Sequence, residues 1–171
     1  MKRLTLLRHA KSSWNDKNLA DHDRPLSERG ERDAPKMGAR LAARRARPSL
    51  ILSSSATRAF TTAKQVAEAL TYPLEFLQTE RRLYLASPQE ILELVGSQED
   101  NFSDLLIVGH NPGLTALANI LVPDLGLDNL PTAGVVAMEF ATRKWSDLAQ
   151  SDPTLLYYDY PKNPELLLIE D

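Results

Sequence analysis

The chain has 171 residues, 43% of them hydrophobic, and a net charge of −3 at pH 7. This size and composition predict a single globular domain spanning residues 1–171, without a broad basic face for nucleic acid. The absence of cysteine excludes disulfides, thiolate metal ligands and cysteine nucleophiles, and no apolar run approaches the roughly 18 residues of a membrane span. We therefore expect a cytoplasmic protein that binds neither membrane nor nucleic acid.

Strand and helix patterns alternate along the first half of the chain. A short apolar run at residues 4–7 predicts a buried strand, and a polar loop follows over residues 11–24. Ser27 is a candidate N-cap for a helix containing Pro35, which would kink that helix or shift its start. A second strand and a second helix with apolar residues at 3-and-4 spacing follow at residues 50–52 and 56–70.

The alternation continues through the second half. Ser87 and Glu90 form a capping-box pattern ahead of a helix that should end near Gly96. Asn111 is a candidate N-cap for the next helix, and no pattern assigns the tail after Pro161. Apolar runs predict four further strands at residues 74–77, 104–109, 135–140 and 155–160. Strands that alternate with helices predict an α/β domain with a largely parallel sheet.

Polar and charged residues follow the predicted strands where parallel sheets bind ligands. Arg8 and His9 end the first strand, His110 and Asn111 follow a later one, and Arg58 lies in the first turn of the helix after the second. Because the carboxyl ends of parallel strands meet at one edge of the sheet, we expect these residues to lie together. Arginine forks match phosphate oxygens, a helix N-terminus favours anions, and imidazole is a competent nucleophile. The pattern indicates phosphoryl transfer.

Four segments resemble the motifs of the histidine phosphatase superfamily, which includes phosphoglycerate mutases and acid phosphatases. Residues 6–15, Leu-Leu-Arg-His-Ala-Lys-Ser-Ser-Trp-Asn, resemble its Arg-His-Gly signature. The other segments occur in the family's order at residues 23–30 (Asp-Arg-Pro-Leu-Ser-Glu-Arg-Gly), 53–59 (Ser-Ser-Ser-Ala-Thr-Arg-Ala) and 108–113 (Val-Gly-His-Asn-Pro-Gly). The small size and the last segment are similar to short phosphohistidine phosphatases of the SixA type.

This resemblance implies a phosphoglycerate mutase-like fold, a three-layer α/β/α sandwich around a mixed, mostly parallel six-stranded sheet with one antiparallel strand. It implies a phosphatase that needs neither metal nor cofactor and that passes the phosphoryl group through a phosphohistidine on His9. Arg8, Arg58 and His110 would hold the phosphoryl oxygens. Hydrogen bonds to the substrate would come from Ser13, Asn15 and Asn111.

The sequence departs from the superfamily pattern at two places. Ala10 stands where glycine usually follows the histidine, which would be costly if that residue needed a positive φ. Mutase-like members carry a proton-donating glutamate where this chain reads Arg-Leu-Tyr-Leu at residues 82–85. The donor is then absent or supplied from elsewhere, with Asp21 as the first candidate beside Asp23 and Glu80.

The missing glutamate bears on the substrate. An alkyl phosphate ester has a poor leaving group and needs a proton donor, whereas phosphohistidine releases imidazole, which is protonated near neutral pH. We therefore expect a histidine-phosphorylated protein as the substrate, acted on by a monomer or a weak dimer.

Three alternatives stay open. Asp21, His22 and Asp23 could ligate a metal in a metal-dependent hydrolase, although no His-Glu-x-x-His motif occurs and the nearby arginines would repel a cation. An inactive relative could keep the arginines and bind phosphorylated partners without turnover. The third alternative is a phosphatase of small phosphate esters.

Overall fold

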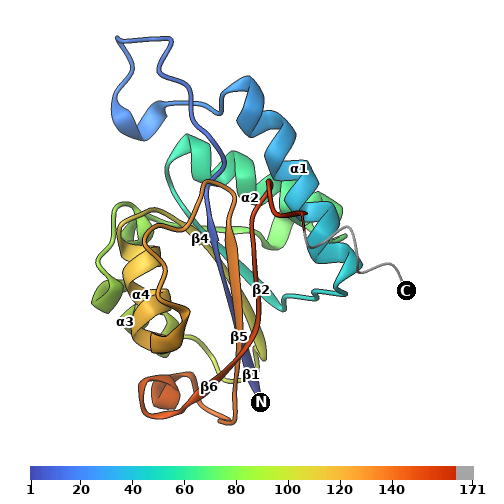
Figure 1. The fold of residues 1–171 in the computed structure, drawn as a ribbon, viewed down its shortest axis with the longest axis vertical. Helices are drawn as coiled ribbons and strands as arrows, with labels where there is room; N and C mark the ends of the chain where they lie inside the picture. Colours follow the sequence, from blue (N-terminus) through green and yellow to red (C-terminus); the bar gives the residue numbers. More distant parts are fainter. Residues whose placement is uncertain (165–171) are drawn as a thin grey trace.

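A six-stranded sheet divides the protein into three layers (Figure 1). The structure, a computed structural model, describes residues 1–164. The strand order is β3-β2-β4-β1-β5-β6, and of these described strands only β5 runs against the other five. The strands are β1 (Lys2–Arg8), β2 (Leu50–Ser54), β3 (Gln78–Glu80), β4 (Asp104–Gly109), β5 (Val135–Phe140) and β6 (Pro153–Asp159). The mixed, mostly parallel sheet with one antiparallel strand is confirmed.

Helices cover both faces of this sheet. In the view of Figure 1, α1 (Glu28–Ala43) and α2 (Thr57–Ala69) lie on one side, and α3 (Pro88–Gly96) and α4 (Gly113–Leu121) lie on the other. This arrangement confirms the three-layer α/β/α sandwich. No helix among the described residues is long and apolar enough to cross a membrane. Short 3-10 helices occur at Asp21–Asp23, Leu74–Phe76, Arg81–Leu83, Pro123–Leu125 and Trp145–Gln150.

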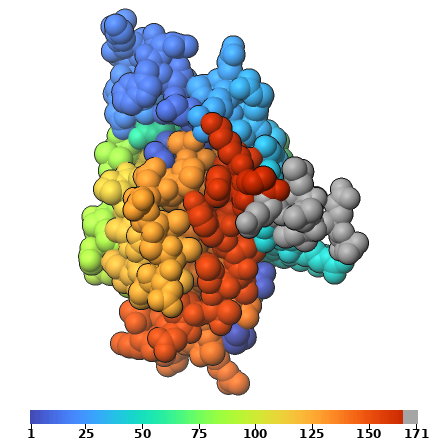
Figure 2. Space-filling view, in the orientation of Figure 1, coloured from blue at the N-terminus to red at the C-terminus, as the bar shows by residue number. Residues whose placement is uncertain are grey.

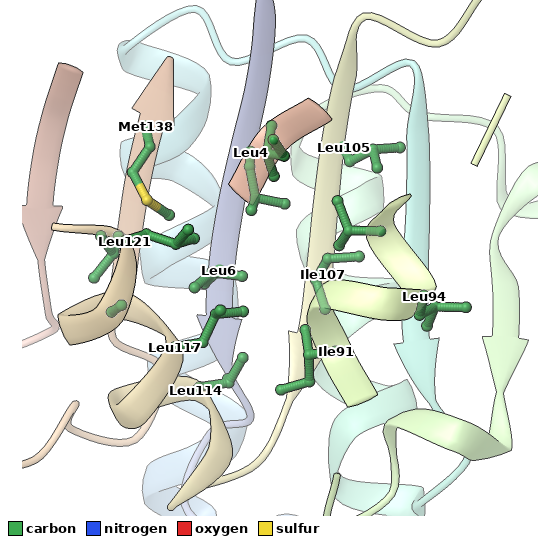
Figure 3. Packing of buried hydrophobic residues seen from close by; sticks show 14 of the residues in the cluster. Leu4, Leu6, Ile91, Leu94, Leu105, Ile107, Leu114, Leu117, Leu121 and Met138 are labelled. Atoms are coloured by element: carbon green, nitrogen blue, oxygen red, sulfur yellow. The ribbon is translucent and has the colours of Figure 1, made fainter. Parts of the chain in front are cut away.

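Each face of the sheet carries its own hydrophobic core, because side chains alternate along a strand. In β1, Leu4 and Leu6 belong to the core under α3 and α4, and Leu7 belongs to the core under α1 and α2. β4 alternates in the same way, and Figure 3 shows Leu105 and Ile107 on the α3 and α4 side. Burying each leucine contributes about 1.5–3 kcal/mol. The two central strands are therefore fixed from both faces, which also fixes the residues at their carboxyl ends.

Two of the three predicted helix caps are confirmed. The Ser27 hydroxyl accepts a hydrogen bond from the Gly30 N–H at 3.2 Å, and Ser87 and Glu90 form the complete capping box. The helix after Ser27 continues through Pro35 to Ala43, with Pro35 on its exposed side. The expectation that Asn111 caps α4 is wrong.

The cap residue of α4 is Pro112, and the Asn111 side chain reaches past it. Its Oδ1 accepts hydrogen bonds from the Thr115 N–H and hydroxyl at 3.2 and 2.8 Å. Asn111 therefore ties the strand end to the first turn of the helix from one position further upstream.

The strand expected at residues 74–77 is also wrong. Residues 74–76 form a 3-10 turn after Pro73, and β3 begins only at Gln78. β3 lies at the edge of the sheet and has exposed or half-buried side chains, so no apolar run marks it. Of the tail that no pattern assigned, residues 165–171 lie outside the described residues.

Gly113 gives a test of how tightly α4 packs beside the strand end. A Cβ at this position would lie 2.1 Å from the Ala86 carbonyl oxygen, a backbone atom that cannot swing away. We expect Gly113→Ala to lower the free energy of unfolding by about 1–3 kcal/mol or more, measured by urea denaturation. The matched control is Gly96→Ala, where the nearest atoms lie 3.8 Å from the added Cβ and stability should stay equal or rise. Equal losses in both variants would contradict this reading of the packing.

Candidate active site

Two histidines lie side by side because β1 and β4 pair in parallel and in register. Arg8 is the partner of Gly109, so the next residues, His9 and His110, leave the sheet together. The His9 N–H donates to the Gly109 carbonyl at 3.1 Å, which extends the pairing by one step. The two ring centroids are 5.1 Å apart, and both side chains are buried. The predicted meeting of these two strand ends is confirmed.

A cavity of about 250 Å³ lies against this pair. A larger hollow of about 600 Å³ beside α3 has neither arginine nor histidine among the described residues that line it, so it offers no comparable chemistry. The smaller cavity is lined by Arg8, His9, Lys11, Ser12, Trp14, Arg24, Arg58, Leu85, His110, Asn111 and Thr132. The sequence-predicted Arg8, His9, Arg58, His110 and Asn111 are therefore brought together.

The His9 ring is held in the form that a nucleophile requires. Its Nδ1 lies 2.7 Å from the Ala10 carbonyl oxygen, which can only accept a hydrogen bond. Nδ1 therefore carries the hydrogen, and Nε2 keeps its lone pair. Burial, together with the charges of Arg58, Arg8 and Arg24, lowers the pKa of His9 to about 4. His9 is neutral at pH 7.

Whereas the His9 ring is held through Nδ1, the His110 ring is held through Nε2. Its Nε2 lies 2.7 Å from the Ser54 hydroxyl, which also accepts a hydrogen bond from the Ala56 N–H at 3.2 Å. We assign the Ser54 hydroxyl as the donor to Nε2, so that the ring hydrogen sits on Nδ1. Nδ1 is buried without a partner. Burial, with the neighbouring His9 and Arg58, lowers the pKa of His110 to about 3.

Three arginines surround the cavity with only part of their hydrogen-bonding capacity used. Arg8 donates to the Leu130 carbonyl at 2.9 Å, and Arg24 donates to the Ser12 hydroxyl at 2.7 Å. Buried nitrogens without a hydrogen-bond partner remain on Arg8 (Nε), Arg24 (Nε and Nη1) and Arg58 (Nε). Unpaired buried donors are rare in folded proteins, and in one cluster they indicate an anion site. Burial first, and the charge of Arg58 second, lower the pKa of Arg8 and of Arg24.

Sequence reasoning did not assign Arg24 to the site. The signal was present, because Arg24 lies in the segment at residues 23–30 that resembles a family block. Arg24 is only 6% exposed, although it comes from a polar loop with no apolar pattern. Without the fold, nothing distinguished it from the other charged residues of that loop.

Thr62 fixes the start of α2 against the residue that follows His9. Its hydroxyl accepts from the Ala10 N–H at 3.0 Å and donates to the Arg58 carbonyl at 2.8 Å. Ala10 is fully buried and is not among the described residues with positive φ, so the departure from glycine carries no backbone strain. One buried hydroxyl therefore couples the His9 and Arg58 backbones.

Asp21 lies beside the arginines but is not among the residues that line the cavity. Its Oδ2 accepts from Arg58 Nη2 at 3.0 Å and from the Tyr84 hydroxyl. Its Oδ1 lies 3.4 Å from Arg24 Nε, an ion pair without hydrogen-bond geometry. The hydrogen bond from Tyr84 and then the contacts with Arg58 hold the pKa of Asp21 below its usual value, against the opposite effect of burial. The contacts favour an ionised anchor for both arginines.

The structure does not place Ser13 and Asn15 in the cavity lining. Ser12 pairs with Leu26 in an antiparallel bridge and is buried, so the alternation of an extended chain turns its neighbour Ser13 away. The Ser13 hydroxyl accepts from the Asn15 N–H at 3.1 Å, and Asn15 is exposed. Asn111 does line the cavity, but its amide already donates to Asn129 and Leu130.

The proposed metal cluster around His22 does not form in the described residues. His22 Nε2 lies 2.8 Å from the Ser55 hydroxyl and its Nδ1 lies 3.2 Å from Asp23 Oδ1. No group of three or more His, Cys, Asp or Glu side chains among residues 1–164 has the geometry of a metal site.

The lowered pKa values of the two histidines give a test of this geometry. We expect both rings to stay neutral down to about pH 5, with midpoints near 4 for His9 and 3 for His110 in a ¹⁵N histidine NMR titration. The unfolded chain takes up these protons below about pH 6.5. The two histidines therefore leave stability intact above pH 6.5 and lower it as pH falls from 6.5 toward 4 for His9 and toward 3 for His110. Midpoints near 6.5 for both rings would contradict the buried arrangement.

Comparisons with known proteins give the family of the chain. The model of the histidine phosphatase superfamily (branch 1) matches residues 4–83. An uncharacterized protein of Mycobacterium tuberculosis is 34% identical over 165 residues, which cover 91% of this chain and all of that protein. An uncharacterized chloroplastic protein of Arabidopsis thaliana is 39% identical over 128 residues, 70% of this chain and 59% of that protein.

Solved structures share the fold over nearly the whole chain. A candidate phosphohistidine phosphatase SixA from Agrobacterium tumefaciens has a TM-score of 0.76 at 29% identity, covering 94% of this chain and 98% of that one. The protein histidine phosphatase SixA complexed with tungstate has a TM-score of 0.78 at 17% identity, covering 93% and 97%, and shows the fold alone. The chain therefore belongs to the histidine phosphatase superfamily, and among solved structures it resembles the SixA phosphohistidine phosphatases.

Proposed function

We propose that the protein is a metal-independent phosphatase that hydrolyses phosphohistidine in proteins, with His9 as the nucleophile. One observation carries the proposal. A neutral His9 and three arginines line one cavity, and none of the residues that line it in the described chain is Asp or Glu. The site therefore supplies a nucleophile and positive charge, but no carboxylic acid that could protonate a poor leaving group lines the described cavity.

The unpaired donors account for binding of the phosphoryl group. Phosphoryl oxygens would accept hydrogen bonds from the free nitrogens of Arg8, Arg24 and Arg58 and from Nδ1 of His110. Each buried donor without a partner costs about 1–3 kcal/mol, so an anion in the cavity offsets several such costs at once. The same positive charges repel a metal ion, which supports the metal-independent form of the proposal.

In the first step, Nε2 of His9 attacks the phosphorus of the substrate. A new P–N bond forms to His9 as the P–N bond to the substrate imidazole breaks. The ring nitrogen of the substrate that does not carry phosphorus takes up a proton from solvent, since imidazole has a pKa of about 6.5, so the ring leaves as neutral imidazole. The arginines stabilise the charge that spreads over the phosphoryl oxygens in the transition state.

In the second step, water attacks the phosphorus of phospho-His9. The P–N bond to Nε2 breaks, inorganic phosphate leaves, and His9 returns to its starting form. The Ala10 carbonyl keeps its hydrogen bond from Nδ1 throughout, so the ring holds its orientation between the two steps.

The leaving group explains the preference for a P–N bond. An alkoxide is far more basic than imidazole and requires an acid beside it. Asp21 remains the candidate for such an acid, but it is ionised and bound to Arg58 and Tyr84. The resemblance to proteins named SixA supports the same substrate class. A cytoplasmic location and a monomer or weak dimer stay predictions.

Phosphate release from a phosphohistidine peptide, with a strong chelator present, tests the nucleophile. We expect wild type to release phosphate and His9→Ala to lose at least about 10³-fold in rate, because the attacking nitrogen is gone. Wild-type protein quenched in alkaline detergent, in which the P–N bond is stable, should carry ³²P on His9, and the variant should carry none.

Each other result favours a different function. Release that His9→Ala leaves intact would mean that the nucleophile is another residue. Release that the chelator abolishes would support the metal-dependent hydrolase. Phosphate binding without release from any substrate would support the inactive relative.

Asp21→Asn separates the anchoring role from a proton-donating one. An anchor for Arg58 and Arg24 should affect substrates alike, so we expect kcat/KM to fall by a similar factor, about 10-fold, for p-nitrophenyl phosphate and for an alkyl phosphate. A proton donor would instead affect the alkyl phosphate far more, because its leaving group is more basic. Asp23→Asn is the matched control, since Asp23 is exposed, pairs with His22 and does not line the cavity. A selective loss on the alkyl phosphate would establish Asp21 as the acid.

A further inference from the structure

The mouth of the cavity carries a large aromatic side chain that the reaction does not use. Trp14 is 67% exposed and still lines the cavity, in the loop between β1 and α1. This loop is blue and stands at the upper end of the molecule, above the carboxyl end of β1 (Figures 1 and 2). An exposed tryptophan that belongs to no core and adjoins a binding cavity is typical of a contact surface.

The Trp14 ring is held in place from one side. The Arg24 guanidinium carbon lies 3.3 Å from the ring centroid, and Arg24 is itself buried and bound to Ser12. Stacking on a fixed guanidinium restrains the ring before any partner binds. Because one face is covered and two thirds of the side chain stays exposed, the other face is open to solvent.

A second apolar side chain comes from a different segment. Leu85 follows the 3-10 helix at Arg81–Leu83, is 56% exposed and also lines the cavity. Its backbone has φ of +50°, a conformation that L residues rarely adopt. Trp14 and Leu85, here called the docking rim, therefore place two exposed apolar groups at a cavity whose other walls are largely polar and positively charged.

We propose that the docking rim binds apolar side chains that flank the phosphohistidine of a polypeptide substrate. This inference rests on the proposed function, since the arginines would hold the phosphoryl group while the rim contacts the chain around it. A free phosphate or a small polar ester has no apolar group to offer the rim. Tryptophan is enriched among the residues that contribute most of the binding free energy at protein interfaces. We therefore assign Trp14 as the residue of the docking rim that determines specificity.

Two phosphohistidine peptides of equal length test the rim. One has Leu and Phe beside the phosphohistidine, and the other has Ser and Gly there. We expect wild type to prefer the apolar peptide by about 10-fold in kcat/KM, with the difference in KM, and Trp14→Ala to lose that preference. Trp14→Phe should restore most of it, because a ring remains on Arg24.

The matched control is Phe76→Ala. Phe76 is 60% exposed, like Trp14, but it is not among the residues that line the cavity. We expect this variant to keep the wild-type preference. Loss of the preference in Phe76→Ala as well would show a general effect of removing exposed aromatics and would overturn the assignment to Trp14.

The outcomes separate the rim from the proposed function. Equal rates on both peptides with wild type would overturn the rim, and hydrolysis of both by a His9-dependent route would leave the phosphatase intact. If neither peptide is hydrolysed, the proposed function fails, and the affinities of His9→Ala for the two peptides then decide on the rim. Equal affinities, or binding of neither peptide, would overturn it.

Discussion

Three guanidinium groups line one small cavity, and the surrounding structure has to hold this concentration of positive charge in place. Arg8, Arg24 and Arg58 come from a strand, a loop and a helix. Their charges repel one another, and several of their buried nitrogens lack partners. Asp21 relieves part of this repulsion by contacting two of them. Under the proposed function, a phosphoryl group entering the cavity relieves the remainder, because its oxygens accept hydrogen bonds from the unpaired nitrogens.

The sheet supplies the rigidity that such an arrangement requires. β1 and β4 are buried on both faces, and Figure 3 shows the residues packed on one of them. The strand ends that carry His9 and His110 therefore do not depend on surface contacts. Short hydrogen-bonded links extend this rigidity outward. Thr62 joins the residue after His9 to the backbone of Arg58, and Ser54 holds the ring of His110. Neutral histidines at neutral pH follow from the same burial and the same positive charges.

Under the two proposals, the division between strand ends and loops separates chemistry from recognition. The two histidines and Arg8 lie where the sheet fixes them, and under the proposed function they act on the phosphoryl group. Trp14, which stacks on Arg24, lies in the loop after β1, where it adjoins the same cavity without belonging to a core. Under the two proposals, a change at Trp14 alters which polypeptide binds without moving Nε2 of His9, because β1 and β4 hold His9 independently of Trp14.

The sequence by itself determined the elements with strong apolar patterns and the residues at their ends. The runs at β1 and β4 placed Arg8, His9 and His110 at one edge of the sheet, since parallel pairing follows from alternating strands and helices. Tertiary structure alone decided the rest. In the folded chain Arg24 is buried, and Ser12 rather than Ser13 lines the cavity. Asp21 accepts hydrogen bonds from Tyr84 and Arg58. Loop residues carry no periodic pattern, so their contacts depend on partners distant in sequence that only the folded chain brings together.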